Sequence, residues 1–200
     1  ETIFLPADKG QRYTHYYQYD FVSQKHQPLY WSVKNTLASW KNMIIPNLTS
    51  SIKPHLYCHL IKENEISIHS NEICEGYFGV EIELFVSQNS LFNSAAIIKP
   101  MLDGIISAFH SYQGKQLDAV SNRLALALSS KADYISKLLL DKSIAFLGNR
   151  CLLHPFKSNI QWNPADDKCM VIKLICKYHN DNSSAKMNGK LFEIKTASTS

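Results

Sequence analysis

The 200-residue sequence lacks several features that would place it at once in a functional class. No apolar run approaches the roughly 20 residues needed to cross a bilayer, so a membrane-spanning role is not predicted. No block of Lys and Arg stands out: the net charge is +4 and the pI about 8.7, which permits a phosphate-rich partner without requiring one. Phosphate-binding loop, nucleophile elbow and zinc motif are all missing, which leaves a small-molecule enzyme without support.

Cysteine is scarce, and its spacing predicts neither a zinc site nor a disulfide framework. Five cysteines are present, an odd number, with no C-x₂-C pair or His/Cys cluster. Cys58, Cys169 and Cys176 lie in apolar runs, where a free thiol behaves as a small hydrophobe. A reducing cytosol is the simplest compartment for such a chain, so we predict a cytoplasmic protein.

The length and the order of the predicted elements favour one α+β domain. Two hundred residues, 45% of them hydrophobic, suit a single globular core. Strand-like segments dominate the first half, a motif-bearing helix and further helices follow, and an apolar strand comes late. We therefore predict a small mixed sheet packed on helices over residues 1–180, with an inserted helical segment at about 115–147 and a mobile tail at 181–200.

Hydrophobic spacing predicts the individual elements. Apolar side chains three and four residues apart predict a helix over 32–45, which Pro46 ends. Alternation is clearest at 76–86, which predicts a strand with one buried and one largely acidic face. The other predicted strands are 13–21, 55–61, 65–69, 159–162 and 169–178, with a short piece at 191–194. The other predicted helices begin at residue 102 and cover 117–128 and 132–140.

Two short acidic segments, far apart in the chain, carry the strongest chemical signal. Residues 99–104 read Lys-Pro-Met-Leu-Asp-Gly and residues 162–167 read Trp-Asn-Pro-Ala-Asp-Asp, so both place carboxylates at a break in an apolar run. Carboxylates from separate elements are the usual ligands of a hard cation such as Mg²⁺. If Asp103, Asp166 and Asp167 meet, we expect them to bind Mg²⁺, which can orient a phosphodiester and generate the attacking hydroxide.

Each of these residues also has a purely structural interpretation. Asp103 is predicted one residue inside a helix start, where the positive helix end favours a carboxylate. Asp166 and Asp167 could form a simple exposed turn, although two adjacent carboxylates repel each other and a cation would relieve that repulsion. His110 is predicted on one helix face with Asp103 and Ser107, as a general base or a phosphate contact. A surface histidine without a role is the alternative.

The order of the segments resembles that of the RusA-type Holliday-junction endonucleases. The resemblance covers about residues 30–180 and rests on a strand-rich first half, a Lys-Pro-x-Leu-Asp helix start at 99–103, and an Asp-Asp turn before a strand that carries Lys177 near its end. It implies a magnesium-binding cluster that the Asp-Asp turn completes, endonuclease activity on DNA, and a homodimer as one expected assembly.

The sequence departs from this pattern within the first motif. In the family that motif usually reads Pro-Asp-x-Asp-Asn, with a lysine one turn into the helix. Here Met101 replaces the first aspartate, Gly104 the asparagine and Ser107 the lysine. The helical stretch 117–146 has no counterpart in the compact family. Glu81 or Glu83 could supply a further metal ligand.

Two functions therefore stay open. The first is a Mg²⁺-dependent DNA endonuclease in which the three aspartates bind the metal and His110 or a lysine assists. The second is a catalytically inactive module that binds nucleic acid or a partner protein within a larger complex. The missing lysine, the missing aspartate and the modest positive charge favour this second function.

Overall fold

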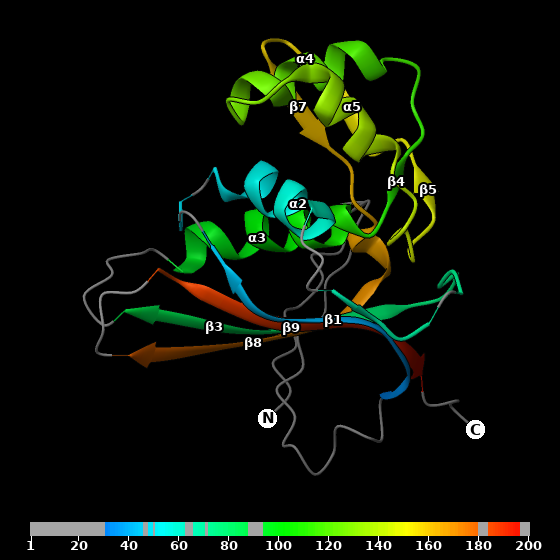
Figure 1. Cartoon of the computed structure of the whole chain (residues 1–200). Helices are drawn as coiled ribbons and strands as arrows, with labels where there is room; N and C mark the ends of the chain where they lie inside the picture. Colours follow the sequence, from blue (N-terminus) through cyan, green and yellow to red (C-terminus); the bar gives the residue numbers. More distant parts are fainter. Residues whose placement is uncertain are drawn as a thin grey trace, which may run out of the picture. The chain divides into compact units, whose positions relative to one another are not determined.

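The fold is seen in a computed structural model of the chain, which describes residues 31–45, 48–49, 51–62, 66–70, 72–87, 94–179 and 184–196 (Figure 1). The compact unit Val33–Ile194 contains all of these residues except two at either end. It combines helices with a mixed sheet, which confirms the predicted α+β class. No helix in these ranges is long and apolar enough to cross a membrane.

Within the described ranges, the main sheet has five strands in the order β2-β1-β9-β3-β8. Their bounds are Trp31–Ile44 for β1, Ser67–Ile68 for β2, Phe78–Ser87 for β3, Cys169–His179 for β8 and Lys186–Thr196 for β9. β3 pairs parallel with β8 and antiparallel with β9, so the sheet is mixed. The strands predicted at 76–86 and 169–178 are confirmed as β3 and β8.

Helix α3 (Ser94–Ala108) follows β3 and lies on the sheet before the chain reaches β8. Parallel strands need a crossover connection, and a crossover helix runs back against the strands that it joins. The C-terminal half of α3 therefore lies at the edge of the sheet where β3 and β8 begin (Figure 1). This arrangement positions the candidate site.

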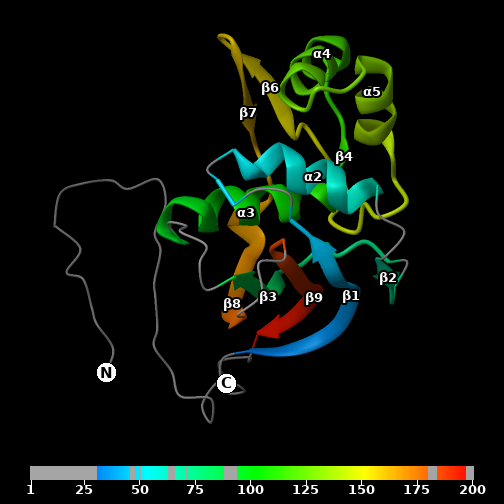
Figure 2. The same cartoon turned by 60° about the vertical axis from the view of Figure 1, so that its left-hand side comes forward.

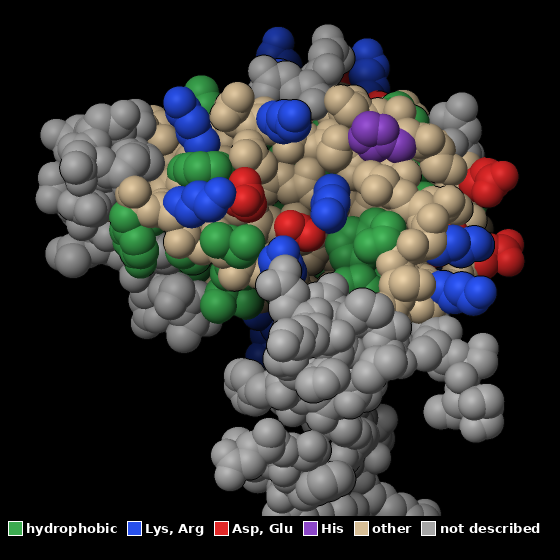
Figure 3. Space-filling model, turned by 90° about the horizontal axis from the view of Figure 1, so that it is seen from below, with side chains coloured by type: hydrophobic (Ala, Val, Ile, Leu, Met, Phe, Trp, Pro, Cys, Tyr) green, Lys and Arg blue, Asp and Glu red, His purple; other side chains and the backbone are tan. Residues whose placement is uncertain are grey.

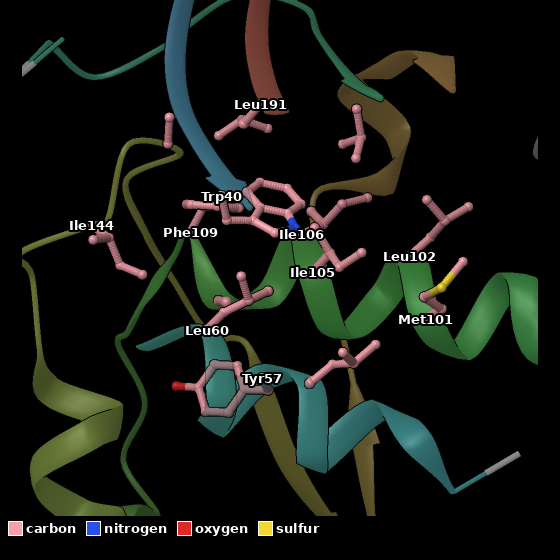
Figure 4. Close-up of a cluster of buried hydrophobic side chains, with 14 of the residues drawn as sticks. Trp40, Tyr57, Leu60, Met101, Leu102, Ile105, Ile106, Phe109, Ile144 and Leu191 are labelled. Atoms are coloured by element: carbon pink, nitrogen blue, oxygen red, sulfur yellow. The ribbon is translucent and has the colours of Figure 1, made fainter. Parts of the chain in front are cut away.

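Helix α2 (Ile52–Lys62) covers α3 on the side away from the sheet (Figures 1 and 4). Ile52, Leu56 and Leu60 recur every four residues and are fully buried, which is the spacing that a packed helix face requires. α3 is consequently buried on both sides, between the sheet and α2.

A further layer stands beyond α2 and contains two helices and a hairpin (Figure 2). α4 (Leu117–Ala127) packs on α5 (Ala132–Leu140) and on the antiparallel pair β6 (Leu153–Phe156) and β7 (Asn159–Trp162). The predicted helices at 117–128 and 132–140 and the short strand at 159–162 are confirmed. The short parallel strands β4 (Ser111–Tyr112) and β5 (Asn149–Arg150) and the 3₁₀ turn η1 (Asp166–Lys168) complete the fold.

Trp40 of β1 lies at the centre of the core. Figure 4 shows it between Leu191 of β9 and the end of α3. Its ring centroid is 5.8 Å from that of Phe109, which in turn lies 6.2 Å from Phe146. Trp40 is 1% exposed, so its whole apolar surface contributes to stability.

Gly189 of β9 provides the space for Trp40, and we predict that Gly189→Ala lowers the free energy of unfolding by about 1–3 kcal/mol. A Cβ added there would overlap the indole ring of Trp40, which cannot move because it is buried. Gly76→Ala is the matched control, since its Cβ would have no neighbour closer than 3.9 Å. Urea unfolding of both variants measures the difference, and equal midpoints would contradict the prediction.

Two predictions in the first half are wrong. The segment 32–45 is the strand β1 rather than a helix: Ala38, Trp40 and Met43 are buried, whereas Val33 and Ile44 of the apparent helical stripe are exposed. Asn42 has a φ of 53°, a local irregularity that shifts the alternation of buried side chains. The segment 55–61 is helical, within α2, because its apolar residues contact α3 and not a sheet.

Other predictions changed in extent. The strand predicted at 65–69 is only the two residues of β2, and the one predicted at 13–21 lies outside the described residues. The short piece predicted within a mobile tail belongs to β9, which runs from Lys186 to Thr196 between β1 and β3. Residues 186–196 are therefore part of the sheet and not a mobile tail.

Candidate functional site

Asp103 and Asp166 come together at the edge where β3 and β8 begin. Lys99 Nζ lies 2.8 Å from Asp103 Oδ1 and 3.0 Å from Asp166 Oδ2, so one ammonium group bridges the two carboxylates. The crossover explains the meeting: Asp103 is in the C-terminal half of α3, and Asp166 is in η1, just before β8. The two acidic segments are thus adjacent in space.

Asp103 does not lie at a helix start. α3 begins at Ser94 and continues through Pro100, so Asp103 is beyond the first turn, and the predicted interaction with the positive helix end does not apply. The residue is buried, 5% exposed. A buried carboxylate needs close partners, because its desolvation is costly otherwise.

Lys53 of α2 is the second partner of Asp103, with Nζ 2.5 Å from Oδ2. Gly104 permits this contact: a Cβ there would lie 2.8 Å from the carbonyl oxygen of Lys53 and 3.2 Å from Leu56 Cβ. The glycine therefore lets α2 approach α3 closely enough for the ion pair to form. Lys53 was missed in the sequence analysis, because it stands 50 residues away with no motif around it.

Trp162 supports Lys53 from the end of β7. Its ring centroid lies 5.8 Å from Lys53 Nζ and 5.5 Å from the ring centroid of Tyr57, which it meets edge to face. The indole is half-buried between these groups. It thus packs against α2 and fixes the lysine beside Asp103.

Asp167 points to a different partner. Arg150 Nη2 lies 3.5 Å from Asp167 Oδ1, and the side chain of Asp167 is 58% exposed. Within the described ranges, no group of three or more His, Cys, Asp or Glu side chains is arranged to hold a metal ion. The two aspartates of η1 therefore diverge, one toward Lys99 and the other toward Arg150.

Lys99 carries the positive charge that Asp103 and Asp166 share. Partial burial acts to lower the pKa of its ammonium group, but hydrogen bonds to Asp103 and Asp166 outweigh burial and raise the pKa above its ordinary value. Lys99 is charged at neutral pH and compensates both carboxylates. Its side chain is 69% exposed, so it can leave this position without disturbing the core.

His110 lies apart from the aspartates. It follows the end of α3, so the helix face predicted to carry it with Asp103 and Ser107 does not include it. His110 is 3% exposed, and Ser107 is buried too. Its Nδ1 is 3.2 Å from the carbonyl oxygen of Gly148. Burial is the main cause that lowers the pKa of the imidazole to about 4, so the ring is neutral at pH 7.

Glu81 and Glu83 are not at the site. They lie on the outer face of β3, where acidic and basic side chains are intermixed (Figure 3). Glu81 pairs with Lys173 at 3.3 Å and Lys190 at 3.0 Å, and Glu83 pairs with Lys177 at 2.8 Å. Lysines of β8 and β9 thus compensate both carboxylates, which lie away from Asp103.

Comparison with known proteins adds no relative: no family model, curated protein or solved structure gives a significant match.

The donor set at Lys99 is compatible with Mg²⁺. Mg²⁺ is commonly bound through one or two carboxylates, with water or substrate phosphate as the remaining ligands. Asp103 and Asp166 already share one cation, and the group between them is an exposed side chain. Asp103 and Asp166 are the residues that would hold the metal. Asp167 follows Asp166 directly in η1.

Proposed function

We propose that the chain is a RusA-like nucleic-acid-binding domain that cleaves DNA phosphodiesters with Mg²⁺ held by Asp103 and Asp166. The observation that carries this proposal is the bridge made by Lys99, which places two carboxylates from distant segments around one cation. The five free cysteines suit a reducing compartment, and we propose that the chain acts in the cytosol.

The chain's own residues would bind and orient the phosphodiester. Mg²⁺, when bound, would polarise the phosphodiester and supply a hydroxide for attack. Lys99, displaced from the carboxylates, and Lys53 beside them place positive charge where negative charge develops on the phosphoryl oxygens. A lysine is the assisting group in this proposal, since His110 is buried against Gly148.

A different observation favours a second function. Each of the three aspartates already has a cationic partner, Lys53 and Lys99 for Asp103, Lys99 for Asp166 and Arg150 for Asp167. Such a network is complete without a metal. In this alternative the chain binds nucleic acid, or a partner protein, without catalysis.

Metal binding and cleavage of branched and linear DNA separate these functions. We expect the wild type to bind Mg²⁺ or Mn²⁺ by calorimetry and to cleave DNA, and Asp166→Asn to lose both, because one of the two shared carboxylates is neutralised. Asp166 is exposed, so this variant should still fold. Asp133→Asn, an exposed aspartate of α5, is the matched control and should retain both properties.

The results that contradict catalysis are equally definite. A chain that binds no divalent metal, and whose DNA binding is unchanged when all three aspartates are replaced, is not this nuclease. DNA affinity that falls steeply with added salt would then support the non-catalytic module. No DNA binding at low salt would point to a protein partner.

A further inference from the structure

β8 forms one edge of the main sheet and is long enough to pair with a further strand (Figure 1). It has 11 residues, none of them proline or glycine, and β3 is its only neighbour among the described strands. The strand at the opposite edge, β2, has two residues. Natural sheets keep exposed edges short or interrupt them with proline, because the backbone donors and acceptors of an edge can pair with another chain. The length and composition of β8 therefore suit strand addition.

One face of β8 carries apolar side chains that extend beyond the core. Directly opposite residues of paired strands share a face of the sheet, and the register with β3 places four apolar residues of β8 opposite core residues: Ile172, Leu174, Cys176 and Tyr178. Leu174 and Cys176 are partly buried against the core, whereas Ile172 is 49% and Tyr178 59% exposed. An added strand with apolar side chains on this face would cover both exposed residues.

The other face of β8 is basic. Lys173 and Lys177 lie on it, and each pairs with a glutamate of β3, Glu81 at 3.3 Å and Glu83 at 2.8 Å. Lys190 of β9 also pairs with Glu81, at 3.0 Å, so three lysines share two glutamates and the network keeps an excess of positive charge. The side chains of Lys173 and Lys177 are about half exposed, so carboxylates on an added strand can reach them.

The same lysines disfavour a second copy of β8 as the added strand. In an antiparallel pair of two β8 strands, a two-fold axis at Lys173 or at Ile175 places lysines directly opposite one another. An axis at Leu174 avoids this but sets Lys173 of each copy diagonal to Lys173 and Lys177 of the other. These are the registers with the longest overlap, and like charges repel in all of them. A strand that carries carboxylates is the favoured partner.

We propose that the edge of β8 binds an extended segment of a partner protein in which apolar and acidic residues alternate. The backbone of the segment continues the sheet, its apolar side chains cover Ile172 and Tyr178, and its carboxylates lie opposite the two lysines of β8. Successive side chains of a strand point to opposite faces, so this alternation places each kind of side chain on the face that suits it. The inference uses none of the residues proposed to hold Mg²⁺ and does not depend on catalysis.

A synthetic peptide of alternating valine and glutamate, as long as residues 170–178 and blocked at both ends, tests the proposal. Fluorescence anisotropy with the full chain should show saturable binding with a Kd below about 1 mM. The matched valine–lysine peptide should bind at least about fivefold more weakly, because its charges repel those of β8. Replacing the central Val-Glu pair by Pro-Pro should abolish binding, since proline removes a donor of the ladder. Hydrogen exchange of the β8 amides should slow in the complex, and that of the β2 amides should not.

Lys173→Glu and Lys190→Glu are a matched pair, because both lysines pair with Glu81 but only Lys173 lies on the edge strand. Both side chains are at least 39% exposed, so both variants should fold. Lys173→Glu should weaken binding of the valine–glutamate peptide at least about fivefold and strengthen binding of the valine–lysine peptide. Lys190→Glu changes the net charge equally but should alter either affinity by less than about twofold, since charges distant from the peptide are screened.

Several outcomes would overturn the proposal. These are no binding of the valine–glutamate peptide, equal binding of its proline variant or of the valine–lysine peptide, and equal effects of Lys173→Glu and Lys190→Glu. A chain that sediments as a dimer, with the β8 amides protected before any peptide is added, would assign the edge to a second copy instead. Asp166→Asn should leave peptide binding unchanged, which separates this surface from the proposed metal site.

Discussion

Asp103→Ala is expected to lower the free energy of unfolding by about 3 kcal/mol, the lower end of the range for breaking a buried ion pair. The substitution leaves Lys53, whose side chain is only 21% exposed, without the carboxylate that lies 2.5 Å away. It also removes a contact that fastens α2 to α3 across the close approach at Gly104. Urea unfolding at neutral pH measures the loss.

Lys99→Ala is the informative comparison, because it removes the other partner of the same carboxylate. Lys99 is 69% exposed, and exposed pairs contribute about 0–1 kcal/mol. In a double-mutant cycle, Asp103 and Lys53 should show a coupling of about 1–3 kcal/mol. If Asp103→Ala and Lys99→Ala cost the same, the burial of the Lys53 pair does not matter and the prediction is wrong.

Stability is expected to fall by about 3 kcal/mol between neutral pH and pH 4 through His110 alone. The pKa of this imidazole is lowered from 6.5 to about 4 in the fold, so the unfolded chain binds more protons over that interval. The contribution is fully present above pH 6.5 and is lost as the pH falls toward 4. Denaturant unfolding at several pH values measures it.

His110→Asn should flatten this pH dependence, since asparagine does not titrate but its amide can still donate to the carbonyl oxygen of Gly148. His69→Asn is the control: His69 is exposed beside Ser39, and its replacement leaves His110 in place. The two variants are compared by the slope of unfolding free energy against pH, not by its absolute value. The same slope in the wild type and in His110→Asn would refute the assignment.

The two acidic segments could be recognised in the sequence as a candidate site, but the side chains that surround them could not. Asp103 and Asp166 belong to a helix and a turn that a parallel crossover brings to one edge. β3 could be predicted from its alternation and β8 from its apolar run. Lys53 arrives through the packing of α2 on α3, which depends on the absence of a side chain at Gly104. No local pattern encodes such a contact between distant segments.

Burial was the other property that the sequence could not supply. Asp103, Ser107 and His110 look like a polar helix face by spacing, yet all three are buried. Asp103 lies against Lys53 of α2, whereas His110 lies against the carbonyl oxygen of Gly148. The same limitation explains β1, whose apolar residues have a helical spacing but are divided between core and solvent. Hydrophobic periodicity identifies helices and strands, whereas the layers packed around each one decide which of its faces are buried.

The place of β9 in the sheet has a consequence for synthesis. Among the described strands of this sheet, β9 comes latest in the sequence, and it lies between β1 and β3, which belong to the first half. Until residues 186–196 have emerged from the ribosome, β9 cannot form between β1 and β3. The edges of β1 and β3 that face β9 in the folded sheet then have unpaired backbone donors and acceptors. The sheet therefore closes only after translation has passed its final strand, and the nascent chain needs protection from aggregation until then.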